Sequence, residues 1–346
     1  MRSEFPPDIS VIIPCRNEER YIGETIDRVA AQTGAGERFT LEMLIVDGKS
    51  DDRTQSVVRE QMGSRPALRL IVNEKQITPV AFNLGIREAR GRYICILGAH
   101  AEIAPDYLQS CLSVIQQVDA DNVGGPWRAQ GYGRVGEAIA VAFQAPFAVG
   151  GAKGHDPDYE GYLDTVWGGF YKREVFERIG LFDEELVRNQ DDELNYRLVK
   201  AGGKIWQSPR ILFFYVCRDS LRQLFLQYYQ YGYWKVRVIR KHRLPASIRH
   251  LVPGGFVGAL LVLLVLAPFN AGAGVLFAAL LVLYAAANLA ASCAASLRAR
   301  QLRLLPVLPA VFAAFHFGYG WGFLRGFVDF VLLRRQGRRQ FSQVTR

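Results

Sequence analysis

Hydrophobic and polar residues follow one another along the first 120 residues in a pattern that predicts strands and helices in alternation. Short runs rich in Ile, Leu and Val are each followed by a longer amphipathic stretch, as in a mostly parallel sheet covered by helices. The composition of these runs fits strands that are buried on both faces. We expect strands at residues 9–13, 41–46, 68–72 and 93–97, and helices at residues 18–32, 53–62, 79–90 and 105–117.

Beyond residue 120 the pattern changes twice. Glycine-rich and aromatic sequence comes first, with helices expected at residues 191–201 and 221–241, and charged residues then vanish from residues 251–297. Two apolar stretches there, residues 252–269 and 273–295, approach the ~20 residues that cross ~30 Å of hydrocarbon. The sequence predicts an α/β domain at residues 1–240 and a membrane region at residues 241–346 with two clear transmembrane helices and a third apolar segment at residues 304–324.

The net charge of +9 is concentrated next to the apolar block rather than spread over the chain. A polybasic segment in that place faces anionic lipid headgroups, so we expect membrane lipids and no nucleic acid as partners. The residues concerned are Lys235, Arg237, Arg240, Lys241, Arg243 and Arg249.

Charge also predicts the orientation of the apolar pair. Arg298, Arg300 and Arg303 follow it and the turn near Asn270 has no charge, so both ends should face the cytoplasm. We expect a multi-pass protein of the cytoplasmic membrane with a cytoplasmic soluble domain and no cleaved signal. A third full crossing at residues 304–324 would leave the basic tail, which includes Arg338 and Arg339, outside; a re-entrant segment and a returning span both remain open.

Five cysteines are scattered along the chain without a C-x-x-C pair. Neither a disulfide framework nor a zinc site is indicated by such spacing. We expect Cys15, Cys95, Cys111, Cys217 and Cys293 to be reduced core residues.

Polar residues follow the first two expected strands at the edge where open α/β sheets bind ligands. Asn17 and the hydroxyl or acidic groups at residues 50–52 have an ordinary explanation as helix caps. Asp47 is different, because a carboxylate directly after a buried strand points into the crevice. There it can accept hydrogen bonds from a nucleobase or a ribose.

These segments resemble the inverting glycosyltransferases of family 2. The resemblance rests on V-I-I-P-C-R-N-E-E ending at Glu19, I-V-D-G-K-S-D-D-R-T ending at Thr54, N-L-G-I from Asn83, and Q-D-D-E-L-N-Y-R ending at Arg197. It covers most of residues 8–240 and is strongest for bacterial succinoglycan-type exopolysaccharide glucosyltransferases. It implies a Rossmann-like GT-A nucleotide-sugar domain, here followed by a C-terminal α-helical membrane region.

The resemblance also implies roles for single residues. Asp47 would contact the uracil of a UDP-sugar with Asp52 supporting its loop, and the nucleotide pocket would include Pro14, Arg16, Glu18 and Asn83. Asp191 is similar to the family's general base, which takes the proton of the acceptor hydroxyl during inverting transfer. Acidic residues in a first helical turn are also ordinary helix chemistry, and only one of the three adjacent acids can point at the sugar.

The chain departs from the family after the fourth strand. Members usually carry Asp-x-Asp there, which binds Mg²⁺ or Mn²⁺ on the diphosphate, whereas this chain has Gly98-Ala99-His100. His100 is a possible nitrogen ligand, better suited to Mn²⁺, and Glu102 would share its side if the backbone stays extended. Alternatively His100 only hydrogen-bonds the diphosphate or a neighbouring loop, and Arg16 or another basic group offsets the charge of the diphosphate.

A last group of residues is similar to the family's acceptor-binding parts. In Trp167-Gly168-Gly169 an indole can stack on a sugar beside small residues, and Asp192 would lie nearby. Gln227, Gln230 and Tyr231 stand where processive synthases carry Gln-x-x-Arg-Trp, which favours transfer of a single sugar. The aromatic residues around them form either an acceptor platform or core packing: Tyr228, Tyr229, Tyr231, Tyr233 and Trp234.

Together these observations predict a membrane-anchored inverting glycosyltransferase. It would move one hexose, with glucose expected, from a UDP-sugar to a polyprenyl-diphosphate-linked saccharide in exopolysaccharide biosynthesis. Two alternatives are a polyprenyl-phosphate glycosyl synthase and a noncatalytic nucleotide-sugar-binding membrane protein, the latter because Gly98-Ala99-His100 has no carboxylate.

Overall fold

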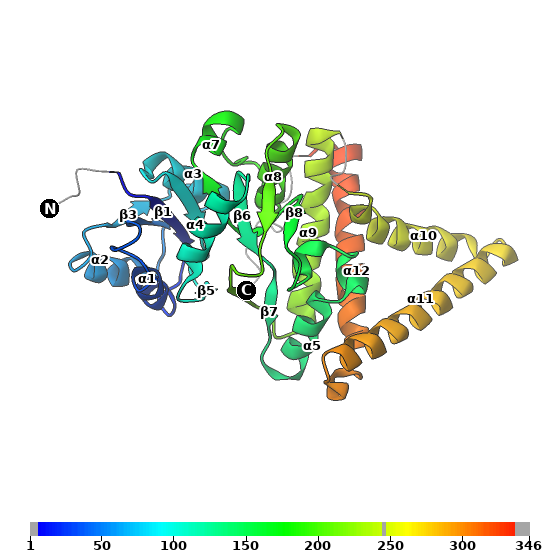
Figure 1. Ribbon diagram of the computed structural model, residues 1–346. Helices are drawn as coiled ribbons and strands as arrows, with labels where there is room; N and C mark the ends of the chain where they lie inside the picture. The colour runs from blue at the N-terminus through cyan, green and yellow to red at the C-terminus, as the bar shows by residue number, and fades with distance from the viewer. Residues whose placement is uncertain (1–5, 244–246, 336–346) are drawn as a thin grey trace. The chain divides into compact units, whose positions relative to one another are not determined.

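The computed structural model describes residues 6–243 and 247–335 (Figure 1). The chain divides into two compact units. The sheet unit consists of Met1–Arg128 and Asp156–Tyr215, and the helical unit of Ala129–His155 and Val216–Arg346. Residues 129–155 and 216–240, which we expected in the first domain, thus group with the C-terminal helices. Arg338 and Arg339 of the expected basic tail lie outside the described residues.

The sheet unit is built on an eight-stranded mixed sheet in the order β3-β2-β1-β4-β9-β6-β10-β8. Strands β1 to β4 are parallel neighbours, whereas β9 runs antiparallel to both β4 and β6. The four expected strands are confirmed. The strands are β1 Ile9–Cys15, β2 Leu41–Asp47, β3 Leu68–Val72, β4 Tyr93–Ile96, β6 Asn122–Gly125, β8 Gly161–Leu163, β9 Trp167–Lys172 and β10 Ile205–Gln207; β5 Glu102–Ile103 pairs with β11 Phe213–Val216, and β7 is Arg128–Gln130.

Helices cover both faces of this sheet, which explains why most side chains of its first four strands are apolar. Val11 and Ile13 of β1 pack with α1 Ile22–Ala30, α2 Thr54–Met62 and α4 Tyr107–Gln117 in one core. Ile12 points to the other face and packs with α3 Thr78–Glu88, α7 Glu174–Ile179 and α8 Gln190–Lys200. The fold is therefore an α/β sheet covered by helices, as predicted.

In the helical unit, α9 Leu221–His242 and α12 Leu308–Gly326 run side by side in the same direction (Figure 1). Glycines on α12 allow this approach, because a Cβ added at Gly322 would lie 1.9 Å from the carbonyl oxygen of Tyr229. Gly318 meets Phe225 and Gly326 meets Tyr233 in the same way. The third apolar segment thus forms a helix packed along the charged α9, followed by a π-helical turn, Phe327–Leu332. This unit also contains the α-helices α5 Gly133–Phe143 and α6 Pro146–Val149.

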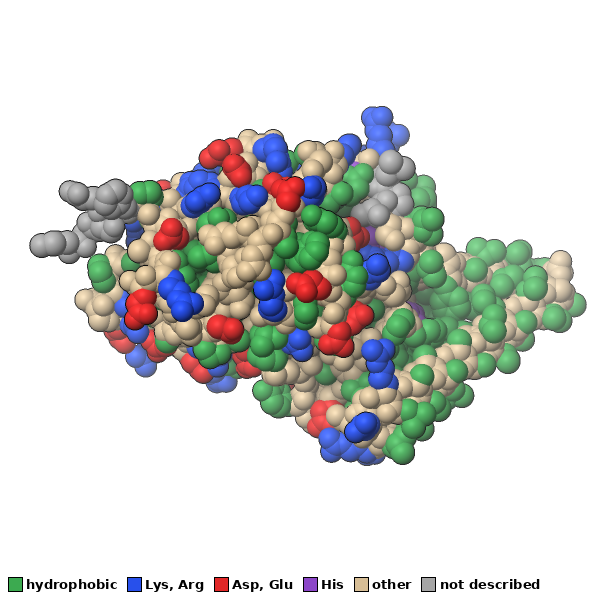
Figure 2. All heavy atoms as spheres, in the orientation of Figure 1, with side chains coloured by type: hydrophobic (Ala, Val, Ile, Leu, Met, Phe, Trp, Pro, Cys, Tyr) green, Lys and Arg blue, Asp and Glu red, His purple; other side chains and the backbone are tan. Residues whose placement is uncertain are grey.

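Two helices of the described chain are long and apolar enough to cross a bilayer, Ile248–Leu266 and Ala271–Arg298. The regular α-helix of the first, α10, is Val252–Leu266, and α11 is Ala271–Arg298. Both are mostly exposed, and apolar side chains cover their surface (Figure 2). Asn270 caps α11, its side chain accepting a hydrogen bond of 3.1 Å from the Ala273 N–H. Because so much apolar surface is incompatible with water, this hairpin indicates association with a membrane.

One side of α11 is polar and holds the helices together. The Asn288 amide donates to the carbonyl of Pro309 at 3.0 Å, and the Tyr284 hydroxyl lies 3.1 Å from Nδ1 of His316. The other imidazole nitrogen of His316 lies 2.8 Å from the carbonyl oxygen of Phe147. His316 therefore links α11, α12 and α6.

Two expectations about side-chain environment are wrong in part. All five cysteines are free, but only four are buried, because Cys293 lies on the exposed side of α11. Lys235 is only 6% exposed on the packed side of α9, so it does not belong to a lipid-facing basic segment.

Candidate active site at the carboxyl edge of the sheet

The topology brings the sequence-predicted loops to one edge of the sheet. The loops after β1, β2 and β4 follow parallel strands and therefore lie at their common carboxyl edge. Strand β9 runs the other way, so it begins at this edge with Trp167. Helix α8 ends four residues before β10, which is parallel to β6. The start of α8, which carries Asp191, therefore points back to the same edge as Asp47.

The loops after β1 and β2 bind each other through side chains. The Asn17 N–H donates to Ser50 Oγ at 2.8 Å, and the Asp51 N–H donates to Asn17 Oδ1 at 3.1 Å. The Glu18 N–H donates to Thr54 Oγ1 at 2.8 Å. Asn17 has a positive φ of 57°, and its side chain binds the loop after β2, whereas the N-cap of α1 is Tyr21. These hydrogen bonds join the two loops at the carboxyl edge of the sheet.

Asp47 is the last residue of β2 and is fully buried. One of its oxygens accepts from the Ser50 N–H at 3.0 Å and from the Gln55 amide at 2.6 Å, and the other accepts from the Ser50 hydroxyl. Burial, followed by the charge of Asp47, raises the pKa of the neighbouring Cys15 thiol. Asp47 therefore holds the loop after β2 in place through these hydrogen bonds. Contact of Asp47 with a uracil stays a prediction, and it requires that one of these hydrogen bonds be replaced by a hydrogen bond to the base.

Asp52 holds the same loop from its other end. Its carboxylate accepts from the Thr54 N–H at 2.9 Å and from the Glu19 N–H at 3.2 Å. Burial acts to raise the pKa of Asp52, but a hydrogen bond from the Thr54 hydroxyl, followed by these two backbone hydrogen bonds, outweighs it and the pKa lies below its ordinary value. Pro14 pairs with Val46 inside the sheet, while Arg16 is exposed at the edge next to Gly48.

His100 faces Glu18 rather than Glu102. Its Nδ1 lies 3.6 Å from Glu18 Oε1, and its side chain is 61% exposed whereas that of Glu18 is 7% exposed. The Ala101 N–H donates to the Gly98 carbonyl at 3.1 Å, so the backbone turns here. The extended geometry that would place His100 and Glu102 on one side is therefore absent.

The side chains of Glu18 and His100 suit a cation that takes its other ligands from a diphosphate. Within residues 6–243 and 247–335, no group of three or more His, Cys, Asp or Glu side chains is placed to hold a metal ion. Glu18 and His100 offer one oxygen and one nitrogen, and Mg²⁺ or Mn²⁺ bound to nucleotides commonly takes its other ligands from phosphate and water.

Asn83 lies on α3 and binds other parts of the protein through its side chain, and its place in the nucleotide pocket stays a prediction. It is 2% exposed. Its amide donates to the Phe182 carbonyl at 2.9 Å and to Glu184 at 3.1 Å, and its oxygen accepts from the Phe182 N–H. Asn83 holds the segment that leads to α8. The hydrogen bond from the Lys75 ammonium, followed by that from the Asn83 amide, holds the pKa of Glu184 below its ordinary value.

Three acids occupy the first turn of α8, and the structure separates their environments. Glu193 is fully buried and pairs with Arg197 at 2.9 Å, so it is a structural residue. Asp191 and Asp192 remain partly exposed. Burial, followed by the charge of Asp191, raises the pKa of Tyr171 on β9. Asn189, with a φ of 59°, turns the chain into the helix.

Trp167 belongs to an aromatic cluster that sequence reasoning missed in part. Its ring stacks on Trp127 with centroids 4.3 Å apart and an angle of 18°, and lies 4.0 Å from Phe213 and 5.2 Å from Tyr215. Gly168 has a φ of 62° and its carbonyl accepts from the Tyr107 hydroxyl at 2.8 Å, and Gly169 continues β9. The run Gly-Gly-Pro-Trp, ending at Trp127, was the available signal.

The remaining acceptor candidates lie in the helical unit on α9. Gln227 and Gln230 are only 4% and 5% exposed, and the Gln227 amide donates to the Tyr231 hydroxyl at 3.1 Å. Tyr233 and Trp234 are buried as well. For these two aromatic residues the core-packing alternative holds, and they form no open platform.

The mixed α/β sheet with acidic loops at its carboxyl edge is similar to known sugar-transferring enzymes, as comparison with known proteins shows. Residues 10–180 match the model of the family described as Glycosyl transferase family 2. The chain therefore carries a domain of glycosyl transferase family 2.

Two relatives extend beyond the family domain. The chain is 29% identical over 329 residues, covering 92% of this chain and 97% of the relative, to dolichyl N-acetyl-α-D-glucosaminyl phosphate 3-β-D-2,3-diacetamido-2,3-dideoxy-β-D-glucuronosyltransferase of Methanococcus voltae. It is 28% identical over 245 residues, 70% of this chain and 73% of the relative, to succinoglycan biosynthesis protein ExoA of Rhizobium meliloti.

A solved structure supports the fold. Mannosyltransferase PcManGT from Pyrobaculum calidifontis, in complex with GDP-Man and Mn²⁺, aligns with a TM-score of 0.58 and 19% identity, covering 92% of this chain and 88% of that one. The GT-A-like mixed sheet expected from the sequence is thereby confirmed.

Proposed function

We propose that the protein is an inverting hexosyltransferase with Asp191 as general base. It would transfer one hexose from a UDP-sugar to a lipid-linked saccharide at the cytoplasmic face of the membrane, and glucose is the hexose that we propose. The observation that supports this proposal most is the position of α8, whose acidic first turn points to the same edge as the loops after β1, β2 and β4.

In the proposed reaction the Asp191 carboxylate takes the proton of the acceptor hydroxyl. The hydroxyl oxygen forms a bond to the anomeric carbon while the bond to the diphosphate breaks, and the nucleoside diphosphate leaves with the electron pair. The positive end of α8 stabilises the carboxylate in its charged form before it accepts the proton. Glu193 is excluded from this role because Arg197 already neutralises it in a buried pair.

A divalent cation bound at this edge would be held by Glu18 and His100. It would supply positive charge for the diphosphate of the donor. The exposed Arg16 offers further positive charge beside Gly48. A buried carboxylate next to an exposed imidazole suits a ligand that arrives together with the nucleotide.

The lipid-linked acceptor is proposed from the apolar hairpin and from the relatives. Helices α10 and α11 expose apolar side chains over most of their length, and the Methanococcus voltae relative is named for a dolichyl phosphate-linked sugar. With both helices in the bilayer as a two-span hairpin, the acceptor reaches the enzyme from the plane of the membrane, where its effective concentration is high.

The general-base role is tested with Asp191→Asn in the full-length protein. Transfer should fall by about 10²–10⁴-fold, as expected for loss of a general base, while UDP binding by calorimetry stays unchanged. Glu174→Gln is the matched control, because Glu174 is an exposed acid in the first turn of α7 and has the same helix-dipole role. Wild-type transfer by Asp191→Asn would contradict the proposal.

The acceptor class has one alternative that the Methanococcus voltae relative favours, since its name describes a sugar linked through a monophosphate. The enzyme would then act on a polyprenyl phosphate or a polyprenyl-phosphate sugar. Mass spectrometry of the product separates the cases, because a saccharide on diphosphate supports the first assignment and a sugar on monophosphate supports the second.

A further inference from the structure

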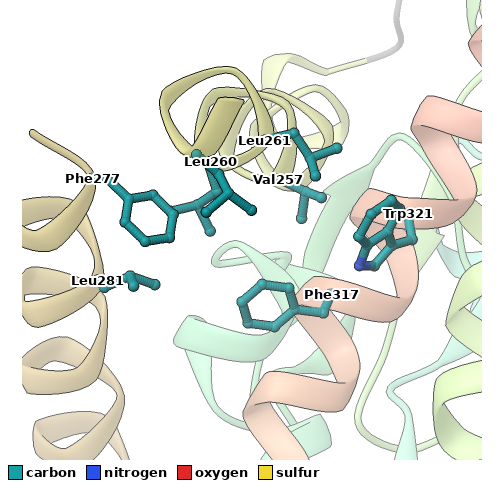
Figure 3. Close-up of a pocket in the computed structure, with 8 residues that line it drawn as sticks. Val257, Leu260, Leu261, Phe277, Leu281, Phe317 and Trp321 are labelled. Carbon is teal, nitrogen blue, oxygen red and sulfur yellow. The ribbon is translucent and has the colours of Figure 1, made fainter. Parts of the chain in front are cut away.

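The helical unit contains an apolar groove formed by three helices (Figure 3). We call it the hairpin groove. Its volume is about 210 Å³. Helices α10, α11 and α12 contribute its lining, which is entirely apolar: Val257, Leu260, Leu261, Leu264, Phe277, Leu281, Phe317 and Trp321.

The groove is open to its surroundings. Leu264 is 52% exposed and Trp321 is 42% exposed, although both line it. The inner wall is firm, because Val257 and Leu260 are buried and a Cβ added at Gly320 would lie 2.4 Å from Val257. Such a site can receive a ligand from the side without rearrangement of the helices.

Positive charge lies directly beyond one end of the groove. Phe317, Trp321 and Arg325 follow one another at intervals of four residues, so they lie on the same side of α12. Nε of Arg325 lies 3.4 Å from a carboxylate oxygen of Asp329, which also accepts from the Tyr233 hydroxyl at 3.1 Å. The buried Asp329 thus positions Arg325 next to the apolar lining. Tryptophan between apolar and charged groups is typical of the membrane interface.

We propose that the hairpin groove holds the hydrocarbon chain of a polyprenyl phosphate-linked acceptor, with its phosphate at Arg325. This inference rests on the proposed function and adds the place where the acceptor's lipid binds. The ligand is an amphiphile, because an apolar lining continues into a cation along one helix face. A narrow groove walled by branched and aromatic side chains accepts a single slender chain better than the paired chains of a phospholipid.

The test uses the full-length protein in nanodiscs of phosphatidylethanolamine and phosphatidylglycerol. The probe is a polyprenyl phosphate with a photoreactive diazirine in its chain, added at low mole fraction. Leu264→Trp places a bulky ring in the groove, and Val265→Trp is the matched control, because Val265 is a neighbour on α10 with 65% exposure that does not line the groove. Leu281→Trp blocks the groove from α11 and serves as a second variant.

Labelling should map to α10 and α12 at the groove, fall at least about fivefold in Leu264→Trp and Leu281→Trp, and stay unchanged in Val265→Trp. Arg325→Gln should weaken labelling by the phosphate but not by the corresponding polyprenol. Equal labelling of the groove variants and the control, or labelling spread evenly over the hairpin, would overturn the proposal in favour of ordinary bilayer lipid. Cross-linked dimers through the groove would overturn it in favour of a second copy of the chain.

Transfer assays separate this inference from the proposed function. If both hold, Leu264→Trp loses transfer to a long-chain acceptor and keeps transfer to a short-chain, water-soluble one. Selective labelling without any transfer would reject the proposed function and leave the groove standing. Wild-type transfer to the long-chain acceptor by Leu264→Trp would reject the groove alone.

Discussion

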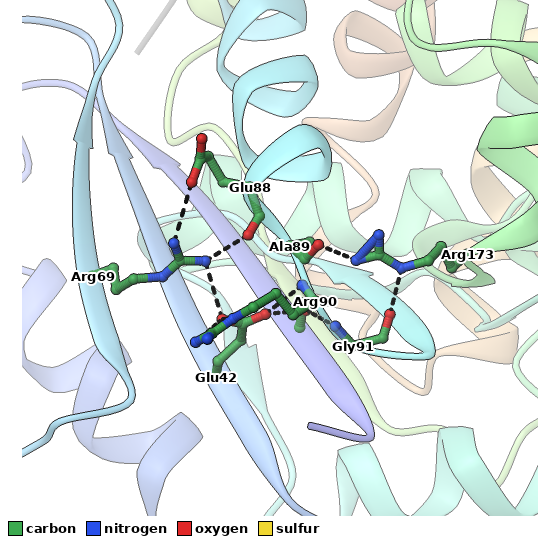
Figure 4. A network of polar contacts seen from close by, with 8 residues as sticks. Glu42, Arg69, Glu88, Ala89, Arg90, Gly91 and Arg173 are labelled. Atoms are coloured by element: carbon green, nitrogen blue, oxygen red, sulfur yellow. Dashed lines mark hydrogen bonds and ion pairs between the residues drawn. The ribbon is translucent and has the colours of Figure 1, made fainter. Parts of the chain in front are cut away.

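Replacement of Glu42 by Gln should destabilise the sheet unit more than any exposed charge change nearby. Glu42 is 2% exposed on β2 and lies at the centre of a network (Figure 4). Its Oε1 accepts from the Ser10 hydroxyl at 2.7 Å and from the Arg90 N–H at 2.6 Å. Its Oε2 lies 3.1 Å from an Arg69 nitrogen and 3.3 Å from an Arg90 nitrogen. A Gln has one acceptor, so its NH₂ group must face donors on one of these sides.

The expected loss of stability depends on the burial of the Glu42 carboxylate and on the partial exposure of its two arginine partners. Breaking a fully buried ion pair costs about 3–5 kcal/mol. The guanidinium groups of Arg69 and Arg90 are 31% and 55% exposed, however, and water screens them once the carboxylate is lost. We therefore expect a loss of about 2–3 kcal/mol, which lowers Tm by about 5–10 °C in a unit of this size.

Tryptophan fluorescence of the purified full-length protein during heating is the assay. Glu88→Gln is the matched control, because Glu88 binds the same Arg69 at 3.2 Å but is 56% exposed, and an exposed pair contributes at most about 1 kcal/mol. Equal Tm values for the two variants would refute the reasoning.

The same network predicts a pH dependence. Burial acts to raise the pKa of Glu42, but the hydrogen bonds from Ser10 and Arg90 and the charges of Arg69 and Arg90 outweigh it and hold the pKa below its ordinary value. The stabilisation is therefore complete above the usual carboxyl range, near pH 4, and is lost as the pH falls through the lower folded pKa. The Tm gap between wild type and Glu42→Gln should be constant at neutral pH and close on acidification.

Two further substitutions test the helical unit and the cation site. Gly322→Ala should lower the stability of the detergent-solubilised protein in thermal unfolding by about 1–3 kcal/mol, because its Cβ would lie 1.9 Å from the Tyr229 carbonyl oxygen. Gly255→Ala on α10 is the control and should leave the stability unchanged, because a Cβ there meets nothing within 4 Å. Equal losses for the two variants would disprove the close packing of α9 and α12. Glu18→Gln should raise the Mn²⁺ concentration for half-maximal UDP-sugar binding about tenfold or more, whereas Glu102→Gln should leave it unchanged; the reverse result would restore Glu102 as the ligand.

The sequence by itself determined the elements of the sheet unit and the apolar hairpin. Expected strands such as residues 68–72 coincide with β3 Leu68–Val72, and the apolar block contains α10 and α11. These features are local, because a run of apolar side chains specifies a doubly buried strand or a lipid-facing helix whatever its neighbours are. The family-type motifs at strand ends are local in the same sense.

Only the tertiary structure decided which side chains meet. Asn17 binds Ser50, 33 residues further along the chain, and Asn83 contacts Phe182, 99 residues further along. His100 meets Glu18 because a turn at Gly98 directs it away from Glu102. Helix α12 lies along α9 because glycines let their backbones approach. Each outcome depends on contacts between distant segments, and the periodicity of a single segment carries no record of its partner.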